Sequence, residues 1–96
     1  MSLKLILVSY DIRNPKRLRK IHKIMKGYGD GIHYSVFRCH LNRKGIVEMK
    51  SDLKEIMHND EDRIMIIDIG PIDRAKKRIT YLGDIPKEKE QDYIIM

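Results

Sequence analysis

The sequence predicts an α/β sandwich, an open sheet with two helices packed on one of its faces. Apolar segments suited to strands alternate with segments whose apolar residues recur every three or four positions, as on helices that face a core. The length of 96 residues allows one modest core, because chains of about 60–150 residues bury roughly 60–70% of their unfolded surface. We therefore expect one globular domain over residues 1–85, followed by a charged linker and an apolar terminal segment over residues 86–96.

The first expected strand is Leu3–Tyr10, which is apolar at all but two positions. Such a run is typical of a strand in the middle of a sheet, buried on both faces. Asp11 follows it directly. Asn14 is a good N-cap and Pro15 suits the first helical position, so a helix should begin there. The stripe of this helix that should face the core is Leu18, Ile21, Met25 and Tyr28.

The second expected strand is Ile32–Leu41, whose apolar residues alternate between two faces. Ten residues are long for one strand, so a bulge or a tight hairpin inside it is an alternative. Asn42 should cap a second helix. Its apolar stripe is Ile46, Met49, Leu53, Ile56 and Met57.

The last third of the chain contains a further buried strand, Arg63–Ile69, which the Gly70-Pro71 pair should end. A helical turn around Asp73–Lys77 and a shorter strand over Arg78–Gly83 are expected next. The terminal Tyr93–Met96 is apolar and follows a charged spacer. Its side chains need a surface to cover them, and the open edge of a sheet, its own or a partner's, would provide one.

Composition excludes several classes of protein. With 42% hydrophobic and 35% charged residues, the chain groups with globular rather than disordered sequences. Apolar runs such as Ile64–Ile67 fall far short of the about 20 residues that a membrane span needs. A lone Cys39 can form neither an internal disulfide nor a Cys-based zinc site. No secretory signal is recognised, so we expect a cytoplasmic protein without a membrane partner.

Positive charge is concentrated in the first half of the chain. The net charge is +6, yet residues 1–45 contain eleven Lys or Arg against two Asp, a balance of +9. A split of this size indicates a polyanionic partner for this half. The alternative is a basic surface without a partner.

Six of these eleven cations lie on the first predicted helix, and four of the six, Lys16, Arg19, Lys20 and Lys23, fall on the side away from its apolar stripe. Like charges four residues apart destabilise a helix, so phosphate contacts explain this face better than solvation does. A second, weaker basic patch spans Arg74–Arg78. The predicted nucleic-acid-binding residues are Arg13, Lys16, Arg17, Arg19, Lys20 and Lys23.

Asp11 is the candidate functional acid, because open α/β sheets usually place ligand sites at the carboxyl end of a central strand. A turn-forming role is the alternative interpretation. Mg²⁺ usually takes one or two carboxylates together with water and phosphate oxygens, and no second acid lies nearby in the sequence. If Asp11 binds a metal, a two-fold dimer would supply its copy as the second ligand.

Several residues, taken in order, resemble a known family. They are Tyr10-Asp11-Ile12, Arg17 and Arg19 in the first helix, Gly29, and the run Tyr34-Ser35-Val36-Phe37. Together they are similar to the CRISPR-associated protein two family, the small endoribonuclease of the adaptation module that accompanies the CRISPR integrase. The resemblance covers nearly the whole chain.

The resemblance implies a ferredoxin-like α+β fold, an antiparallel sheet with two helices on one face, in a homodimer. Its C-terminal strand, containing Tyr93, Ile94 and Ile95, would extend the sheet of the dimer. Asp11 and its copy would hold Mg²⁺ across the interface. Tyr10, Ser35 and Phe37 would shape the catalytic site, while Arg17 and Arg19 would hold phosphate.

The activity that the resemblance implies is metal-dependent cleavage of single-stranded RNA or double-stranded DNA. The same family also bridges two CRISPR integrase dimers during spacer acquisition, so a DNA-binding scaffold without turnover is a second hypothesis. An RNA-cleaving protein of the toxin type is a third. Two positions depart from the family pattern: His33 replaces a frequent glutamine, and Gly31 replaces a frequent basic residue.

Overall fold

The computed structural model describes residues 3–84, and these residues form a β-α-β-β-α-β unit followed by short helical turns. The elements in chain order are β1 (Lys4–Asp11), α1 (Pro15–Lys26), β2 (Gly29–His33), β3 (Val36–Leu41), α2 (Arg43–Ile56), β4 (Arg63–Pro71), α3 (Ile72–Ala75) and the 3-10 helix η1 (Lys76–Arg78). Within residues 3–84, no helix is long and apolar enough to cross a membrane.

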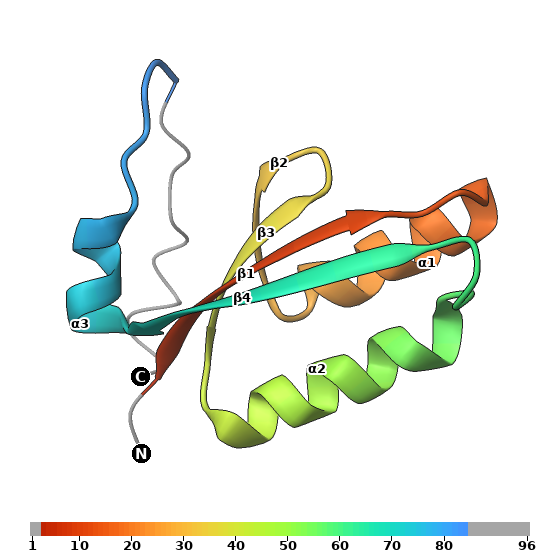
Figure 1. Cartoon of the computed structure of the whole chain (residues 1–96), viewed down its shortest axis with the longest axis horizontal. Helices are drawn as coiled ribbons and strands as arrows, with labels where there is room; N and C mark the ends of the chain where they lie inside the picture. The colour runs from red at the N-terminus through yellow and green to blue at the C-terminus, as the bar shows by residue number, and fades with distance from the viewer. Residues whose placement is uncertain (1–2, 85–96) are drawn as a thin grey trace.

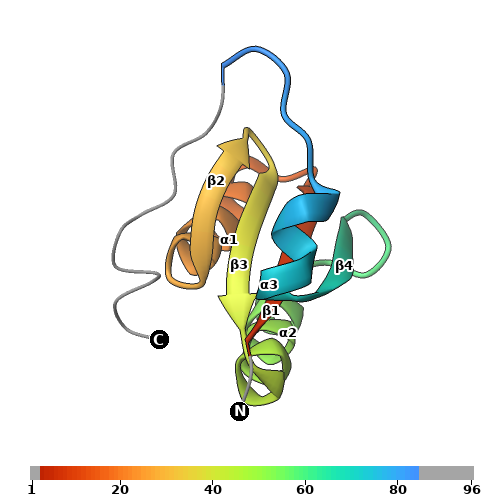
Figure 2. The same ribbon diagram turned by 90° about the vertical axis from the view of Figure 1, so that its left-hand side faces the viewer.

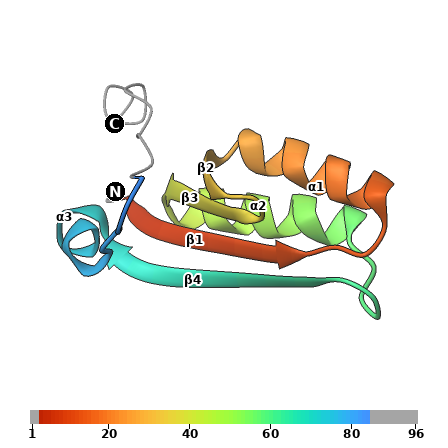
Figure 3. The ribbon, with the colours of Figure 1, turned by 90° about the horizontal axis from the view of Figure 1, so that it is seen from above.

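The four strands form one sheet in the order β2-β3-β1-β4, and every neighbouring pair is antiparallel. Both long helices, α1 and α2, lie on the same side of this sheet (Figures 1 and 3). This arrangement confirms the ferredoxin-like α+β fold and the central position expected for β1. The predicted dimerisation strand at Tyr93, Ile94 and Ile95 lies outside the described residues, as does the linker before it.

The core fills the space between the sheet and the two helices. From β1 it receives Ile6, Val8 and Tyr10, which alternate along the strand. Its remaining buried members are Ile12, Ile21, Met25, Phe37, Cys39, Met49 and Leu53. The buried free thiol of Cys39 is therefore part of the packing.

Both helices begin where their caps were predicted. The Asn14 side chain accepts hydrogen bonds from the backbone N–H groups of Lys16 and Arg17, at 2.8 and 3.1 Å. The Asn42 side chain accepts one from Gly45 at 2.8 Å. These bonds satisfy backbone donors that the first turn of a helix leaves without partners.

The hairpin that was the alternative for Ile32–Leu41 is present, so this segment contributes to both β2 and β3. Two expectations need correction. Leu18, expected in the core with Ile21 and Met25, is 37% exposed, whereas α1 buries Ile21 and Met25 as predicted. The predicted strand Arg78–Gly83 is not one, whereas the helical turn expected before it is present as α3 and η1.

The second face of the sheet is partly covered by the segment after β4. Figure 2 shows α3 in front of the sheet, with α1 and α2 behind it. Ala75 and Leu5 are buried here, and the Arg38 guanidinium of β3 donates a hydrogen bond of 3.0 Å to the Tyr81 hydroxyl. This contact ties Tyr81 to β3 without strand pairing.

Candidate functional site

Asp11 is the last residue of β1. Its exposed side chain lies on the open face of the sheet, which is the face opposite to α1 and α2. The alternation of β1 causes this, because Tyr10 and Val8 point into the helix-covered core. Ser9 and Leu7 share the face of Asp11. The residue opposite Asp11 in the register of the sheet is Arg63, the first residue of β4.

One chain offers a single carboxylate at this position. Among residues 3–84, no group of three or more His, Cys, Asp or Glu side chains is placed to hold a metal ion. Within the same residues, Asp11 makes no hydrogen bond or ion pair, so its oxygens are available to a ligand. This donor set fits Mg²⁺ only if further oxygens come from a second chain, from substrate phosphate or from water.

Tyr10 is adjacent to Asp11 in sequence but belongs to a different environment. It is 4% exposed, and its hydroxyl forms a 2.8 Å hydrogen bond with His22 Nδ1 of α1. Burial raises the pKa of Tyr10, so the phenol remains protonated at neutral pH. Phe37 is 2% exposed and stacks on Tyr10, with the ring centroids 6.2 Å apart. The rings of Phe37 and His22 meet edge to face, with centroids 5.3 Å apart. These three rings anchor the end of β1 on α1 and lie on the side of the sheet away from the Asp11 carboxylate.

Ser35 reaches the same strand end through its backbone. It lies in the turn between β2 and β3, and its carbonyl oxygen accepts a 3.0 Å hydrogen bond from the Tyr10 N–H. This bond continues the pairing beyond the Ser9–Val36 register. The turn therefore lies beside the last residues of β1, and Tyr34 at its tip is fully exposed.

Arg17 forms the main ion pair near the site. Its guanidinium contacts Asp62 through Nε at 2.8 Å and through Nη2 at 3.2 Å, and Nη2 also contacts Glu61 at 3.0 Å. These contacts occupy the side chain on the protein itself. Arg17 thus joins α1 to the loop before β4, while its predicted role in binding phosphate stays a prediction.

The other predicted cations are free to meet a polyanion. The exposed Lys16, Arg19, Lys20 and Lys23 of α1, and Arg13 before it, make no ion pair with any residue in the range 3–84. No acid occurs in the first turn of α1. The helix therefore presents one uncompensated positive face, which begins a few residues after the end of β1.

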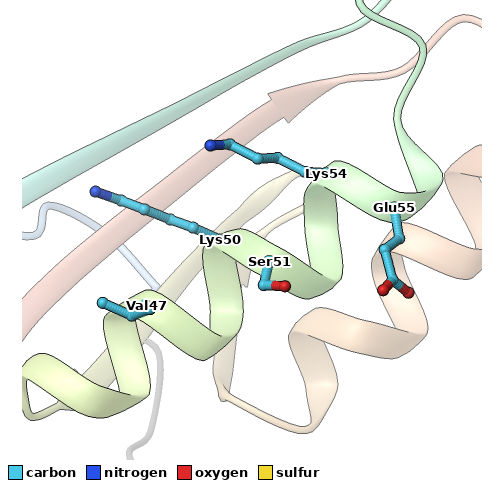
Figure 4. Close-up of a pocket in the computed structure, with 5 residues that line it drawn as sticks. All are labelled: Val47, Lys50, Ser51, Lys54 and Glu55. Carbon is cyan, nitrogen blue, oxygen red and sulfur yellow. The ribbon is translucent and has the colours of Figure 1, made fainter.

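A second lysine-bearing surface lies on α2, on the helix-covered side of the sheet. A shallow hollow of about 470 Å³ is lined by Val47, Lys50, Ser51, Lys54 and Glu55. Figure 4 shows the two lysines extending in the same direction, with Glu55 turned away from them. Because all of the lining residues described come from one helix, the hollow provides no convergent set of catalytic groups.

Comparison with known proteins supplies the family. The family model described as CRISPR associated protein Cas2 matches residues 4–77, which span β1 to η1. The chain belongs to the Cas2 family. A CRISPR-associated endoribonuclease Cas2 from Geobacter sulfurreducens is 40% identical over 79 residues, 82% of this chain and 83% of the relative. A second endoribonuclease Cas2, from Rhodospirillum rubrum, is 33% identical over 90 residues, 94% of this chain and 88% of the relative.

Solved structures agree with this assignment. Streptococcus pyogenes Cas2 is similar with a TM-score of 0.72 and 31% identity, over 82% of this chain and 99% of the other. A hypothetical protein from Thermus thermophilus has a TM-score of 0.78 at 23% identity, over 91% and 99% of the two chains, and supports the fold alone. The recognition made from the sequence is confirmed.

The two departures from the Cas2 pattern lie on the β2 strand. His33 is exposed and is paired in register with Val36. Gly31 is exposed, has no positive φ, and a Cβ added there would meet only the Phe37 ring, at an ordinary 3.7 Å. Packing therefore leaves room at residue 31 for the larger basic side chain that the pattern favours.

Sequence reasoning missed two residues that organise this end of the Cas2 fold, Asp62 and His22. The sequence alone assigns no functional role to either residue. A signal for Asp62 was present, since three consecutive acids precede β4 while residues 13–26 carry seven cations and no acid. No comparable signal identified His22, because its partner Tyr10 lies twelve residues away on another element.

Proposed function

We propose that this chain is a CRISPR adaptation protein that acts as a dimeric, Mg²⁺-dependent endonuclease on single-stranded RNA or double-stranded DNA. The observation that carries the proposal is the Asp11 carboxylate, exposed on the open sheet face and without a partner among residues 3–84. The names of the Geobacter and Rhodospirillum relatives, both endoribonucleases, support the activity.

The proposed metal site is shared between two chains. A Mg²⁺ ion needs about six oxygen ligands and usually takes one or two from carboxylates, and each chain supplies Asp11. The ion would activate water and neutralise charge on the phosphodiester. Arg13 and Lys16, which follow Asp11 in the chain, would bind the neighbouring phosphates.

Apolar residues on the face of Asp11 support a dimer through this surface. Met65 and Ile67 of β4 are 52% and 38% exposed, and Leu7 and Val36 beside them are half-buried. In register, Met65 is opposite Ser9 and Ile67 is opposite Leu7. Two copies meeting here would cover this patch and bring their Asp11 side chains to one interface, where two-fold symmetry makes both chains contribute equally.

Cleavage of RNA and duplex DNA in Mg²⁺ tests the nuclease proposal. We expect Asp11→Asn to abolish cleavage while duplex binding persists, because the cations of α1 remain. Heterodimers of one wild-type and one Asp11→Asn chain, isolated with two affinity tags, should also be inactive. Heterodimers that retain about half of the wild-type activity would indicate two independent sites and would contradict the shared one.

Oligomeric state tests the dimer separately. We expect Ile67→Glu to convert the dimer to a monomer, because two charges would face each other at an apolar interface. Removal of Tyr93–Met96 should weaken the dimer, if these residues extend the sheet of the partner. The charge-matched control is Val47→Glu on α2, which is exposed but far from the open face. Light scattering during size-exclusion chromatography distinguishes the states.

A scaffold bridging two CRISPR integrase dimers is the second candidate. It is favoured by the sparse catalytic equipment, since Tyr10 and Phe37 are buried and Asp11 is the one acid among the residues of β1. Under this proposal, pure wild-type protein cleaves neither substrate in Mg²⁺ but co-elutes with an integrase and duplex DNA. Mg²⁺-dependent cleavage that Asp11→Asn abolishes would favour the nuclease.

A further inference from the structure

Asp62 is a fully buried carboxylate, with a side-chain exposure of 0%. Its Oδ1 accepts hydrogen bonds from the Arg13 N–H at 3.0 Å and from Arg17 Nη2 at 3.2 Å. Its Oδ2 accepts from Arg17 Nε and from the His58 N–H, both at 2.8 Å. Each oxygen therefore receives two donors, which is the condition under which a buried charge is tolerated.

These donors come from the segments that surround the proposed metal site. Arg13 lies two residues after Asp11, in the loop from β1 to α1, and Arg17 lies in the first turns of α1. Asp62 itself directly precedes Arg63, the residue of β4 that is opposite Asp11 in register. The Asp62 carboxylate thus connects the loop that follows Asp11 with the start of β4, the strand paired with Asp11.

The core fixes the other side of this loop. Tyr10 is anchored by His22, and Ile12 is buried. Asp11 lies between these two buried neighbours, with its own side chain exposed. The Arg13–Asp62 bond is the next restraint along the chain, so it limits how far the backbone at Asp11 can rotate. It also sets where the cations of α1 begin relative to the carboxylate.

We propose that Asp62 is a positioning residue, which orients the Asp11 carboxylate for metal binding and holds the basic start of α1 beside it. The inference deepens the proposed function and rests on it. Arg17 is the partner that neutralises Asp62, so it acts on the site through Asp62 as well. Asparagine at residue 62 would point its amide N–H group at the N–H donors that Asp62 accepts from. It would therefore lose the bond to Arg13, Arg17 or His58.

Metal affinity of the purified dimer, measured by calorimetry with Mg²⁺ and Mn²⁺, tests the proposal. We expect Asp62→Asn to weaken binding by about 10- to 100-fold, as removal of groups that orient a metal ligand typically does. Arg17→Lys, which keeps the charge but cannot form the two-pronged pairing with the carboxylate, should have a smaller effect. The control is Asp60→Asn, an exposed acid two residues away, which should bind metal like the wild type. All variants are compared below their unfolding temperatures.

Backbone order gives a readout that does not depend on metal. Amide relaxation and hydrogen exchange should show increased motion at Asp11–Asn14 in Asp62→Asn but not in Asp60→Asn. Wild-type order together with wild-type metal affinity in Asp62→Asn would overturn the positioning role. A wild-type protein that binds no Mg²⁺ would instead overturn the proposed function, and the relaxation data would still decide whether Asp62 orders the loop.

Discussion

Tyr10 and Asp11 are consecutive residues of β1, yet their side chains leave opposite faces of the sheet. Tyr10 is buried against α1 and bonded to His22, while Asp11 is exposed on the open face. A strand separates consecutive side chains in this way because its period is two residues. The two residues can therefore serve one site only indirectly, Tyr10 by fixing the strand end and Asp11 by meeting the ligand.

The variant Tyr10→Phe tests this division. It retains the ring that stacks on Phe37 and removes the hydroxyl bonded to His22. We expect the free energy of unfolding to fall by about 1 kcal/mol, the usual net contribution of one hydrogen bond. Mg²⁺-dependent cleavage should be kept, whereas Asp11→Asn should lose it. Urea unfolding and an RNA cleavage assay provide the two measurements, and a folded Tyr10→Phe protein without activity would place the hydroxyl in the chemistry.

The basic face of α1 should determine the salt dependence of binding. We expect replacement of Lys16, Arg19, Lys20 and Lys23 together by Gln to lower the slope of log affinity against log salt. The decrease should be about 0.9 for each duplex DNA phosphate that the helix no longer neutralises. The matched control replaces Arg43, Lys44, Lys50 and Lys54 of α2, which removes the same charge from the other helix. Equal effects of the two variants would mean that net charge, rather than the α1 face, attracts the nucleic acid.

Gly31→Arg should strengthen nucleic-acid binding. The position is exposed and sterically open toward Phe37, and an added cation beside the strand end can reach one more phosphate. We expect tighter binding to duplex DNA and a salt slope larger by about 0.9.

Two controls belong with this change. Gly31→Gln adds comparable bulk without charge and should leave the slope unchanged. Gly29→Ala marks the other extreme, because a Cβ there would overlap the Arg38 carbonyl oxygen and lie 2.7 Å from Cys39 Sγ. Such overpacking costs about 1–3 kcal/mol of stability. Unchanged slope and affinity in Gly31→Arg would show that phosphate does not approach β2.

Local signals in the sequence predicted much of the fold. Asn14 and Asn42 act within three residues of themselves, so their caps are legible from the chain alone. The position of Asp11 at a strand end is equally local. The division of Ile32–Leu41 into β2 and β3 was left open, since the same alternation suits one long strand or two short ones.

The features that sequence reasoning missed depend on distant partners. The Arg17–Asp62 contact joins residues 45 positions apart, and no spacing rule connects them. Arg78–Gly83 has the composition of a strand, yet Tyr81 is held by Arg38 across the open face. Resemblance placed Tyr10 and Phe37 near the chemistry, whereas the period of the strands assigns them to the core.

Acid stability should depend on Asp62. Hydrogen bonds from Arg17, with those from the His58 and Arg13 backbone, hold the pKa of Asp62 well below its usual range. A carboxylate whose pKa is depressed by folding stabilises the protein fully above its unfolded pKa of about 3.9, and this contribution is lost as the pH falls toward the folded pKa.

Below about pH 4 the unfolded wild type therefore binds up to one proton more at Asp62 than the folded protein. Asp62→Asn lacks this difference, so its stability should decline less steeply between about pH 4 and pH 2. Urea unfolding at several pH values measures both slopes, with Asp60→Asn as the control. Parallel curves for wild type and Asp62→Asn would show that Asp62 is not the group whose protonation destabilises the fold in acid.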